Sequence, residues 1–532
     1  MYREFQRRLS ALASEVPGPL LWQGKKGLEK ESLRVTPCGD IARTPHPAAL
    51  GSALTHPHIT TDYSEALIEL ITPPFERNEE TLAFLRQIHQ VVYRELDREL
   101  LWCTSMPCAV GGDESVPIAS YGTSNSGMMR HIYRRGLAHR YGRVMQVISG
   151  VHYNYSVPLE LWPRLREIEG DRRSERDFVS DRYLGLVRNV LRYGWLLIYL
   201  FGASPALCRS FLGDRAERFQ RFDETTRYEP FATSLRMSDI GYTNSSQTGL
   251  NVVYDGLEGY VRSLTAAIET PHPAYEAIGV RVGGEYRQLN ANILQIENEF
   301  YSPVRPKQIT ERGEKPTQAL LRRGVAYVEV RSLDVNPFSP IGVDAEQMAF
   351  LEGFMLFCLL HESPPLGPEE RVGVDRNTAL TAHEGRRPGL ELVRAGGDPV
   401  ALADWGQELL AEIAGLAEHF EGAALADSVE GLRGRLEDPQ TTPSARMLEE
   451  MRAGKVGFFR YALAVSRAHK ERLLEESAAL GRDVLDRWRS WAQTSLSEQR
   501  ALEADDSVSF ESYLAQYFEG DPEVSEPAAG AG

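Results

Sequence analysis

Alternating apolar and polar residues predict several β-strands in the first two thirds of the chain. In these runs β-branched and aromatic residues alternate with polar ones, as in strands with one buried face. We expect strands at residues 66–72, 151–157, 250–254, 289–301 and 327–335. Short helices do not alternate regularly with these runs, as a doubly wound parallel sheet would require. The pattern therefore favours an antiparallel α+β fold.

The C-terminal part has a different pattern, that of amphipathic helices. Between residues 398 and 517 apolar positions recur with a helical period, for example in 401–420 and 444–499. We expect an α+β region at 1–395 that carries the chemistry, and a helical scaffold at 396–519 packed on it. Residues 520–532 contain too little apolar surface to fold and predict a flexible tail.

The composition limits the possible partners. Fifty-nine Lys and Arg against 75 Asp and Glu give a net charge of −16, so the overall field repels nucleic acid and anionic lipid. The longest apolar run, 193–203, is about half of the ~20 residues that span a bilayer, and we interpret it as a buried core helix. The N-terminus lacks a continuous apolar segment typical of a signal peptide, which favours a cytoplasmic protein with neither nucleic-acid nor membrane partners.

The cysteines are few and widely spaced. There are five, with no CxxC pair: Cys38, Cys103, Cys108, Cys208 and Cys358. This argues against both a disulfide framework and a zinc site, so we expect reduced and mostly buried thiols. For Cys108 a small buried hydrophobe is favoured over a nucleophile.

The common nucleotide and hydrolase motifs are missing. The chain contains neither GxxxxGK[ST] nor a GxGxxG opening a helix, and neither HExxH nor GxSxG. If the protein uses ATP, it does so without a P-loop. What the sequence offers instead is acidic residues at strand positions.

Two segments place carboxylates where a strand would bring them together. In 27–35, Glu29 and Glu31 are two apart and point to one face of a strand. Two like charges side by side favour a cation between them, although a solvated edge strand is the simpler interpretation. Glu69 lies inside an apolar strand, where solvation is less favourable. Asp62 has the opposite parity, so a turn must intervene if both reach one site.

A second pair of strands repeats this theme. Glu329 and Arg331 share one face of the strand 327–335, where they form a cross-strand ion pair or engage a ligand. His152 shares a face with Asn154, and a lone histidine there is more often structural than a ligand.

The acidic strand faces together indicate a metal site more strongly than any one of them does alone. Glu297 and Glu299 continue the pattern, although a structural role is slightly favoured for them. Hard oxygen ligands in this number suit Mg²⁺ with phosphate rather than zinc.

The basic counterpart is the segment 130–143, which holds five arginines in an acidic protein. Arg130 and Arg134 lie on one helical face, and the planar guanidinium suits carboxylate and phosphate. A solvated helix face is the default alternative. Arg236, Arg305 and Lys307 add isolated cations that fit anion clamps.

Long motifs connect these residues to a known family. The segments GLEKESLRV (27–35), ALIELITP (66–73), YGRVMQVISGVHYNYS (141–156), TSLRMSDIGYTN (233–244), LQIENEFYSPVRPK (294–307) and YVEVRSLDVNPFSPIGVD (327–344) stand in this order. In sequence, order and spacing the chain closely resembles the proteobacterial type of glutamate–cysteine ligase. The resemblance covers residues 27 to about 389 and thins toward the C-terminus.

This resemblance implies ATP-dependent joining of the γ-carboxylate of glutamate to the amine of cysteine, the first step of glutathione synthesis. It implies a glutamine synthetase-like fold, a curved antiparallel sheet that forms a funnel flanked by helices. It further implies bound Mg²⁺, with Mn²⁺ as a substitute, and a γ-glutamyl phosphate intermediate.

The resemblance also assigns roles to individual residues. The expected metal ligands are Glu29, Glu31, Asp62, Glu69, His152 and Glu329. The expected substrate contacts are Tyr133, Arg134, Arg236, Tyr242 and Arg331. Tyr301, Arg305 and Lys307 are expected near the nucleotide, and Arg331, Arg236 and Glu329 are expected to act in catalysis.

Two alternatives stay open at this point. A related ligase with the same metal site could join glutamate to a different amine, because pocket residues select the acceptor. A protein with this fold could also bind metal or amino acid without catalysis. The resemblance further suggests a monomer and feedback inhibition by glutathione, which carries the same γ-glutamyl-cysteinyl group.

Overall fold

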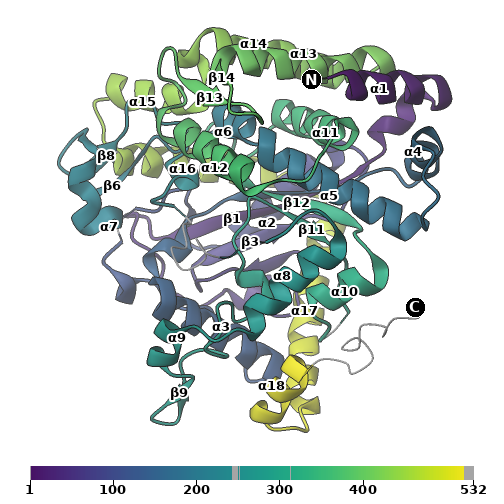
Figure 1. Ribbon diagram of the computed structural model, residues 1–532. Coiled ribbons are helices and arrows are strands. Elements are labelled where there is room, and N and C mark those ends of the chain that lie inside the picture. Colours follow the sequence, from purple (N-terminus) through teal and green to yellow (C-terminus); the bar gives the residue numbers. More distant parts are fainter. Residues whose placement is uncertain (1, 109, 242–249, 251, 312, 520–532) are drawn as a thin grey trace, which may run out of the picture.

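A curved antiparallel sheet forms the centre of the protein (Figure 1). The computed structural model describes residues 2–108, 110–241, 250, 252–311 and 313–519 of the 532. Every neighbouring strand pair of the main sheet is antiparallel, which confirms the predicted α+β class. Its order is β11 (Val304–Lys307), β12 (Tyr327–Leu333), β5 (Val151–Ser156), β1 (Lys25–Val35), β3 (Leu67–Ile71) and β2 (Ile59–Thr61), with β4 (Leu100–Leu101) also on β1.

The two faces of this sheet differ in chemistry. Leu28 on β1 lies opposite Tyr153 on β5, and Tyr153 lies opposite Val330 on β12. These three side chains are fully buried in the main core, beneath α2 (Asn78–Glu95), α5 (Glu175–Tyr193) and α11 (Ala345–Leu360). Because side chains alternate along a strand, Glu29 and Glu31 point to the opposite face.

Other helices and small sheets surround this centre. The remaining helices before residue 400 are α1 (Arg3–Glu15), α3 (Asn125–Tyr141), α4 (Leu161–Glu169), α6 (Trp195–Phe201), α7 (Arg209–Leu212), α8 (Leu257–Glu269), α9 (Pro273–Ile278), α10 (Pro316–Arg323) and α12 (Pro368–Glu384). The smaller sheets consist of β6 (Ala206–Cys208), β7 (Gln220–Arg221) and β8 (Thr226–Tyr228), of β9 (Arg281–Val282) and β10 (Glu285–Tyr286), and of β13 (Glu391–Val393) and β14 (Pro399–Ala401).

The apolar run 193–203 forms the end of α5 and all of α6. Every residue of α6 is buried, which confirms the prediction of a core helix. In the described part of the chain, no single helix has the length and apolar composition needed to cross a membrane. Helices α5 and α6 reach that composition only as a pair bent by 56°.

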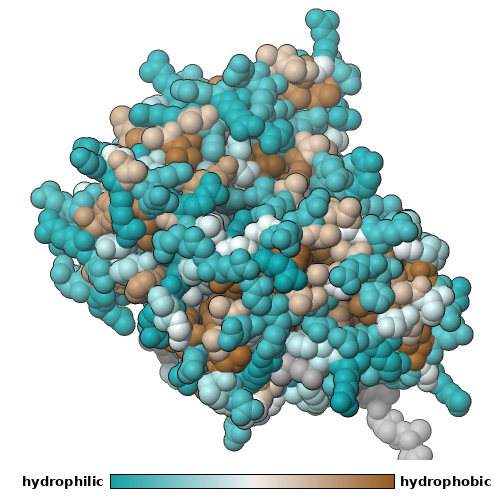
Figure 2. Space-filling view, turned by 90° about the horizontal axis from the view of Figure 1, so that it is seen from above, coloured by the Kyte–Doolittle hydropathy of each residue, from teal (hydrophilic) through white to brown (hydrophobic). Residues whose placement is uncertain are grey.

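The C-terminal part is helical, as predicted. It comprises α13 (Leu402–Phe420), α14 (Ala423–Glu437), α15 (Pro443–Ala453), α16 (Phe458–Ser477), α17 (Arg482–Asp505) and α18 (Phe510–Glu519). Viewed from above, the face over α13, α14 and α1 is mainly hydrophilic with separate hydrophobic patches (Figure 2), as expected for amphipathic helices with an exposed side. In Figure 1, α17 and α18 return toward α3 at the other end of the molecule.

Two strand predictions are wrong. Residues 289–301 form a loop with one 3₁₀ turn, Glu297–Glu299, because polar side chains replace strand partners there. Asn290 Oδ1 accepts from the Asn292 N–H, and Asn290 Nδ2 donates to the Gln295 carbonyl. The described residues of 250–254 likewise form no strand. The domain limits at 395 and 519 remain predictions, and the predicted tail lies outside the described residues.

The expectation of reduced cysteines is wrong for one pair. Cys108 and Cys208, which are both buried, form a disulfide with their Cα atoms 5.4 Å apart. They are 100 residues apart in the chain, so spacing cannot reveal a contact that only the tertiary fold creates. This pairing excludes Cys108 as a free nucleophile. Cys103 and Cys358 are buried free thiols, whereas Cys38 is an exposed one.

Candidate active site

The polar face of the sheet brings acidic residues from three strands together with a histidine from a fourth. Glu29 on β1 lies opposite His152 on β5, and Glu31 lies opposite Glu69 on β3. Glu329 on β12 lies opposite Asn154, two residues beyond His152. Cross-strand neighbours of this kind hold side chains within contact distance, so the register alone assembles the cluster.

Asp62 reaches the cluster through a turn. β2 ends at Thr61 and β3 starts at Leu67, so Asp62 lies in the turn between these strands. This is the turn that its strand parity required, and Asp62 lines the same cavity as Glu69.

His152 is the centre of the acidic cluster. Its Nδ1 lies 3.4 Å from Glu29 Oε2 and 3.4 Å from Glu329 Oε1, and its Nε2 lies 3.9 Å from Glu31 Oε1. Two further contacts orient the carboxylates. Asn154 Nδ2 donates to Glu29 Oε1 at 2.9 Å, and the Gly150 N–H donates to Glu31 Oε2 at 2.7 Å.

Basic side chains flank the cluster on the β11 and β12 side. Arg331 Nη1 lies 2.8 Å from Glu329 Oε1, and Lys307 Nζ lies 3.3 Å from Glu329 Oε2. Burial alone would raise the pKa of Glu329, but Lys307 and Arg331 hold it well below its ordinary value. Glu329 is therefore an anion across the physiological range.

The other carboxylates respond to burial and to one another. Burial, together with the charges of Glu29 and Asp62, raises the pKa of Glu69 well above its ordinary value. Burial also raises the pKa of Glu31. Repulsion among buried like charges is relieved by a cation, so the cluster has the electrostatic character of a cation site.

The donor atoms fit a divalent cation. Within the described residues, two groups each offer three ligand atoms lying within 4.8 Å of one another: Glu29, His152 and Glu329, and Glu31, Glu69 and His152. Ligands on opposite sides of one Mg²⁺ are about 4.2 Å apart. Carboxylate oxygens dominate both groups, which suits Mg²⁺ or Mn²⁺ better than zinc.

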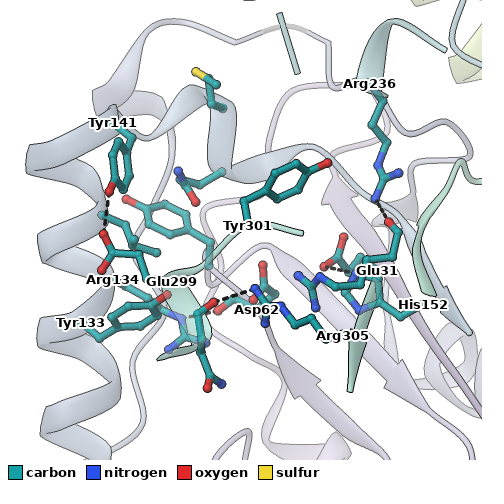
Figure 3. Close-up of a pocket in the computed structure, with 16 residues that line it drawn as sticks. Glu31, Asp62, Tyr133, Arg134, Tyr141, His152, Arg236, Glu299, Tyr301 and Arg305 are labelled. Carbon is teal, nitrogen blue, oxygen red and sulfur yellow. Dashed lines mark hydrogen bonds and ion pairs between the residues drawn. The ribbon is translucent and has the colours of Figure 1, made fainter. Parts of the chain in front are cut away.

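A small cavity of about 130 Å³ adjoins the cluster (Figure 3). Helix α3 forms one wall, with Tyr133, Arg134 and Tyr141 directed toward the cavity, and Tyr301 projects into it from the loop before β11. The Ser124 hydroxyl caps the start of α3 by accepting from the Gly127 N–H at 3.2 Å.

Arg134 is held at the rim of this cavity by the turn that carries Asp62. Its Nε donates to the Asp62 carbonyl, and its guanidinium carbon lies 4.7 Å from the centre of the Tyr121 ring. The ring face favours the cation. The guanidinium therefore has a defined position beside both cavities that it lines.

Arg236 enters the small cavity from the 3₁₀ turn Leu235–Met237. It is 2% exposed, and its Nη2 donates to the Arg331 carbonyl at 2.9 Å. Its Nη1 lies 3.8 Å from Asp334 Oδ1. Asp334 is itself fixed by the Ala203 N–H and the hydroxyls of Ser204 and Ser234.

A second, larger cavity of about 1210 Å³ opens from the same cluster. Lys307 and Arg130 line it, and Arg305 lines both cavities. Sequence reasoning missed the C-terminal contribution to its wall, which comes from Asp505, Asp506, Tyr513 and Tyr517. The i, i+4 spacing of the two tyrosines was the available signal.

The structure gathers almost every residue named as a site candidate. The six expected metal ligands and Arg331 line the two cavities with the cations described above. Tyr301, expected near the nucleotide, lines the small cavity, where its hydroxyl lies 3.7 Å from Met237 Sδ. Tyr242 lies outside the described residues. Glu299, for which sequence favoured a structural role, lines the small cavity and pairs with Arg140 at 2.9 Å.

Comparisons with known proteins agree with this arrangement. The family model for glutamate–cysteine ligase matches residues 9–381. The chain is 49% identical over 515 residues to the glutamate–cysteine ligase of Pseudomonas paraeruginosa, covering 96% of this chain and 97% of that protein. It is also 49% identical over 520 residues to the enzyme of Azotobacter vinelandii, covering 96% and 98%.

Solved structures show the same fold. The glutamate–cysteine ligase of Francisella tularensis, in complex with AMP, is 35% identical, with a TM-score of 0.88 over 93% of this chain and 98% of that chain. A bifunctional glutathione synthetase from Pasteurella multocida is 29% identical, with a TM-score of 0.67 over 89% of this chain and 54% of that chain.

The fold and the acidic site together define an ATP-dependent ligase. More specifically, the chain belongs to the glutamate–cysteine ligase family, and it makes γ-glutamylcysteine in the first step of glutathione synthesis. Both alternatives from the sequence, a different amine acceptor and a non-catalytic binding protein, are thereby set aside.

Proposed function

We propose that the ligation proceeds through γ-glutamyl phosphate, formed where the acidic cluster meets the two cavities. The observation that carries this proposal is the convergence of carboxylates from β1, β3 and β12 with Arg236, Arg305 and Arg331 at one place. Phosphoryl transfer needs compensation of negative charge more than it needs a protein nucleophile. A mixed acidic and basic site of this kind provides that compensation.

The acidic cluster is the proposed metal site. Its ligands are Glu29, Glu31, Asp62, Glu69, His152 and Glu329, and either Mg²⁺ or Mn²⁺ fits their donor atoms. A divalent ion bound there would neutralise charge on the ATP phosphates. Lys307 and Arg331 keep Glu329 ionised and therefore ready as a ligand.

The arginines orient and stabilise the reacting groups. Arg331 and Arg236 stabilise the phosphoryl group as it moves to the γ-carboxylate of glutamate. Glu329, besides its role as a ligand, holds the Arg331 guanidinium through the contact at 2.8 Å. The amine of cysteine then attacks the γ-carbonyl carbon, and phosphate leaves with the electrons of the broken C–O bond.

The two cavities separate the substrates. The small cavity holds the amino acids, with Tyr133 and Arg134 near cysteine and the carboxylates. The large cavity holds ATP, with Lys307 and Arg305 near its phosphates, and Tyr301 approaches the nucleotide from the small cavity that it lines. Size and charge support this division. The large cavity has room for a nucleotide, and Lys307 lines the large cavity but not the small one.

Three further properties belong to this proposal. The ligase acts as a monomer, as the family resemblance suggests, and the residues that line its two cavities on this chain are compatible with that state. It acts in the cytoplasm, where ATP and glutamate are supplied. Glutathione inhibits it by placing the same γ-glutamyl-cysteinyl group in the small cavity.

The experiment uses purified protein with ATP, Mg²⁺, cysteine and glutamate labelled with ¹⁸O in the γ-carboxylate. Transfer of one ¹⁸O atom to each phosphate released, matched by γ-glutamylcysteine, supports the acyl phosphate. Dipeptide formation with unlabelled phosphate contradicts it. Parallel reactions with 2-aminobutyrate, alanine and ammonia measure how strongly the site selects cysteine.

A further inference from the structure

His383, at the end of α12, bridges two carboxylates outside the cavities. Its Nδ1 lies 2.7 Å from Glu229 Oε2, and its Nε2 lies 2.8 Å from Asp239 Oδ1. Glu229 and Asp239 are ten residues apart and flank the turn that carries Arg236. One imidazole therefore ties both ends of this segment to the same helix.

The backbone around His383 holds the middle of the same segment. The Ala382 carbonyl accepts from the N–H groups of Thr233 and Ser234 at 2.9 and 3.2 Å. Arg386 continues this contact beyond the helix, where its Nη2 donates to the Pro230 carbonyl at 2.7 Å. The end of α12 and Arg386 just beyond it therefore contact residues 229–239 at both ends and in the middle.

The position of Arg236 depends on these contacts between α12 and residues 229–239. Its guanidinium is packed tightly, because a methyl group added at Gly150 would lie 2.2 Å from Arg236 Nη2. Its own turn begins at Leu235, whose N–H donates to the Ser204 carbonyl at 2.8 Å. A shift of the segment ends would move the guanidinium relative to Arg331 and the small cavity.

We propose that His383 is a positioning residue for the ligase reaction, which clamps Glu229 and Asp239 so that Arg236 is aligned at the small cavity. This inference rests on the proposed role of Arg236. His383 does not line either substrate cavity, so it acts through the segment and not by touching substrate.

The clamp depends on the charge of the imidazole. Only the imidazolium donates from both ring nitrogens, whereas neutral histidine donates from one. The hydrogen bond to Glu229 and the charges of both carboxylates raise the pKa of His383 above its ordinary value despite partial burial. Arg218 also faces this site, 4.0 Å from Asp239, and Glu384 on α12 is paired with Arg387 at 2.6 Å.

The sign of the pH dependence follows from this. The imidazolium form of His383, which donates from both ring nitrogens, is fully populated at low pH. It is lost as pH rises through the raised pKa of His383. His383 is one quarter exposed, so solvent protons reach it. Alignment of Arg236 should therefore weaken at high pH, independently of the deprotonation of the cysteine amine.

The test compares full-length variants in dipeptide formation between pH 6 and pH 9. His383→Gln removes the titrating charge, and His383→Arg retains a cation that does not titrate in this range. His419→Gln, at an exposed histidine of α13, is the matched control. At pH 6.5 we expect His383→Gln to lower kcat/KM about tenfold, with His383→Arg close to the parent protein. The ratio of the parent to His383→Gln should fall toward one as pH rises.

Two further readouts identify how the effect arises. In an Arg236→Lys background, His383→Gln should add little further loss, because both changes act through the same guanidinium. Hydrogen exchange of residues 229–241, corrected for intrinsic rates, should be faster in His383→Gln at pH 6.5 and unchanged in His419→Gln. This second readout needs no turnover.

The outcomes separate the two proposals. Coinciding pH profiles for the parent and His383→Gln, equal damage from His383→Arg, or a full additional loss in the Arg236→Lys background would each overturn the positioning role. A failure of ¹⁸O transfer would overturn the acyl phosphate instead. In that case unchanged hydrogen exchange in His383→Gln would still contradict the clamp, and faster exchange would still support it.

Discussion

Glu329 and Arg331 lie two residues apart on β12 and form an ion pair of 2.8 Å between Oε1 and Nη1. Lys307, from the neighbouring strand β11, approaches the other carboxylate oxygen at 3.3 Å. Glu329 is 1% exposed, so its buried carboxylate is an anion between two cations. Its Oε1 also lies 3.4 Å from His152 Nδ1. This carboxylate therefore joins the acidic cluster to the basic side of the site.

Replacing Glu329 with Gln should abolish most of the turnover while leaving the protein folded. The amide keeps the shape but loses the charge that holds both cations and serves as a metal ligand. We expect kcat to fall by at least about 100-fold, measured as dipeptide formation at saturating ATP. Glu297→Gln is the control, since Glu297 is buried but lines neither cavity. Near-normal rates in Glu329→Gln would remove Glu329 from the mechanism.

A methyl group at Gly150 should disturb Arg236 without disturbing the sheet. An alanine Cβ there would lie 2.2 Å from Arg236 Nη2, a contact that only movement of the guanidinium can relieve. Displacement by about 1 Å costs up to about 100-fold in rate, so we expect kcat/KM of Gly150→Ala to fall by about 10- to 100-fold.

The matched control is Gly27→Ala on β1. The nearest atoms to its added methyl are 3.8 Å away, so its rate should stay within about twofold of the parent. The thermal unfolding midpoint of both variants checks the fold. A normal rate in Gly150→Ala would show that the exact position of Arg236 does not limit the reaction.

Strand parity explains how much of the site could be predicted. The two-residue repeat of a strand predicts that Glu29 and Glu31 share one face of β1 and that Glu329 and Arg331 share one face of β12. The repeat does not state which strands are neighbours. The pairing of β5 between β1 and β12, which places His152 at the centre, is a tertiary arrangement that no local pattern encodes.

The parts that escaped prediction depend on contacts distant in sequence. The sequence favoured a structural role for Glu299 but did not identify its partner Tyr141, because only the packing of α3 against the 289–301 loop brings the two together. The disulfide of Cys108 with Cys208 and the contribution of α18 to the large cavity arise in the same way. In 289–301 the polar side chains form hydrogen bonds with the loop backbone. Their spacing resembles the alternation of polar and apolar residues in a strand, which is why the pattern predicts a strand there.

The buried pair of Arg140 and Glu299 should contribute strongly to stability. Both side chains are almost fully buried, at 0% and 1% exposed, and Tyr141 also donates to Glu299 at 2.6 Å. Arg140→Met leaves this carboxylate without its cation, and we expect the free energy of unfolding to fall by about 3–5 kcal/mol.

The exposed pair of Arg135, which is also on α3, and Glu285, on β10, provides the comparison. Its side chains are 29% and 76% exposed, so Arg135→Met should cost only about 0–1 kcal/mol. Denaturant unfolding of both variants measures the difference. Equal stability of the two variants would contradict the structural importance of the buried pair.

His56 should make the protein less stable in acid. Its Nδ1 accepts hydrogen bonds from the N–H groups of His58 and Ile59 at 3.1 and 3.0 Å, and its ring stacks on Trp488 of α17. Burial, with the charge of His58, lowers the pKa of His56 from 6.5 to about 4. The folded state therefore binds fewer protons than the unfolded state between these values.

The stabilisation from neutral His56 is complete above pH 6.5 and is lost as pH falls through about 4, a loss of about 3 kcal/mol. In His56→Asn the side-chain oxygen accepts the same N–H groups but does not titrate, so stability should fall less steeply between pH 7 and pH 4. The measurement is urea unfolding at each pH, with the exposed His419→Asn as control. If the free energy of unfolding of His56→Asn falls as steeply between pH 7 and pH 4 as that of the parent, protonation of His56 is not the cause of the acid destabilisation.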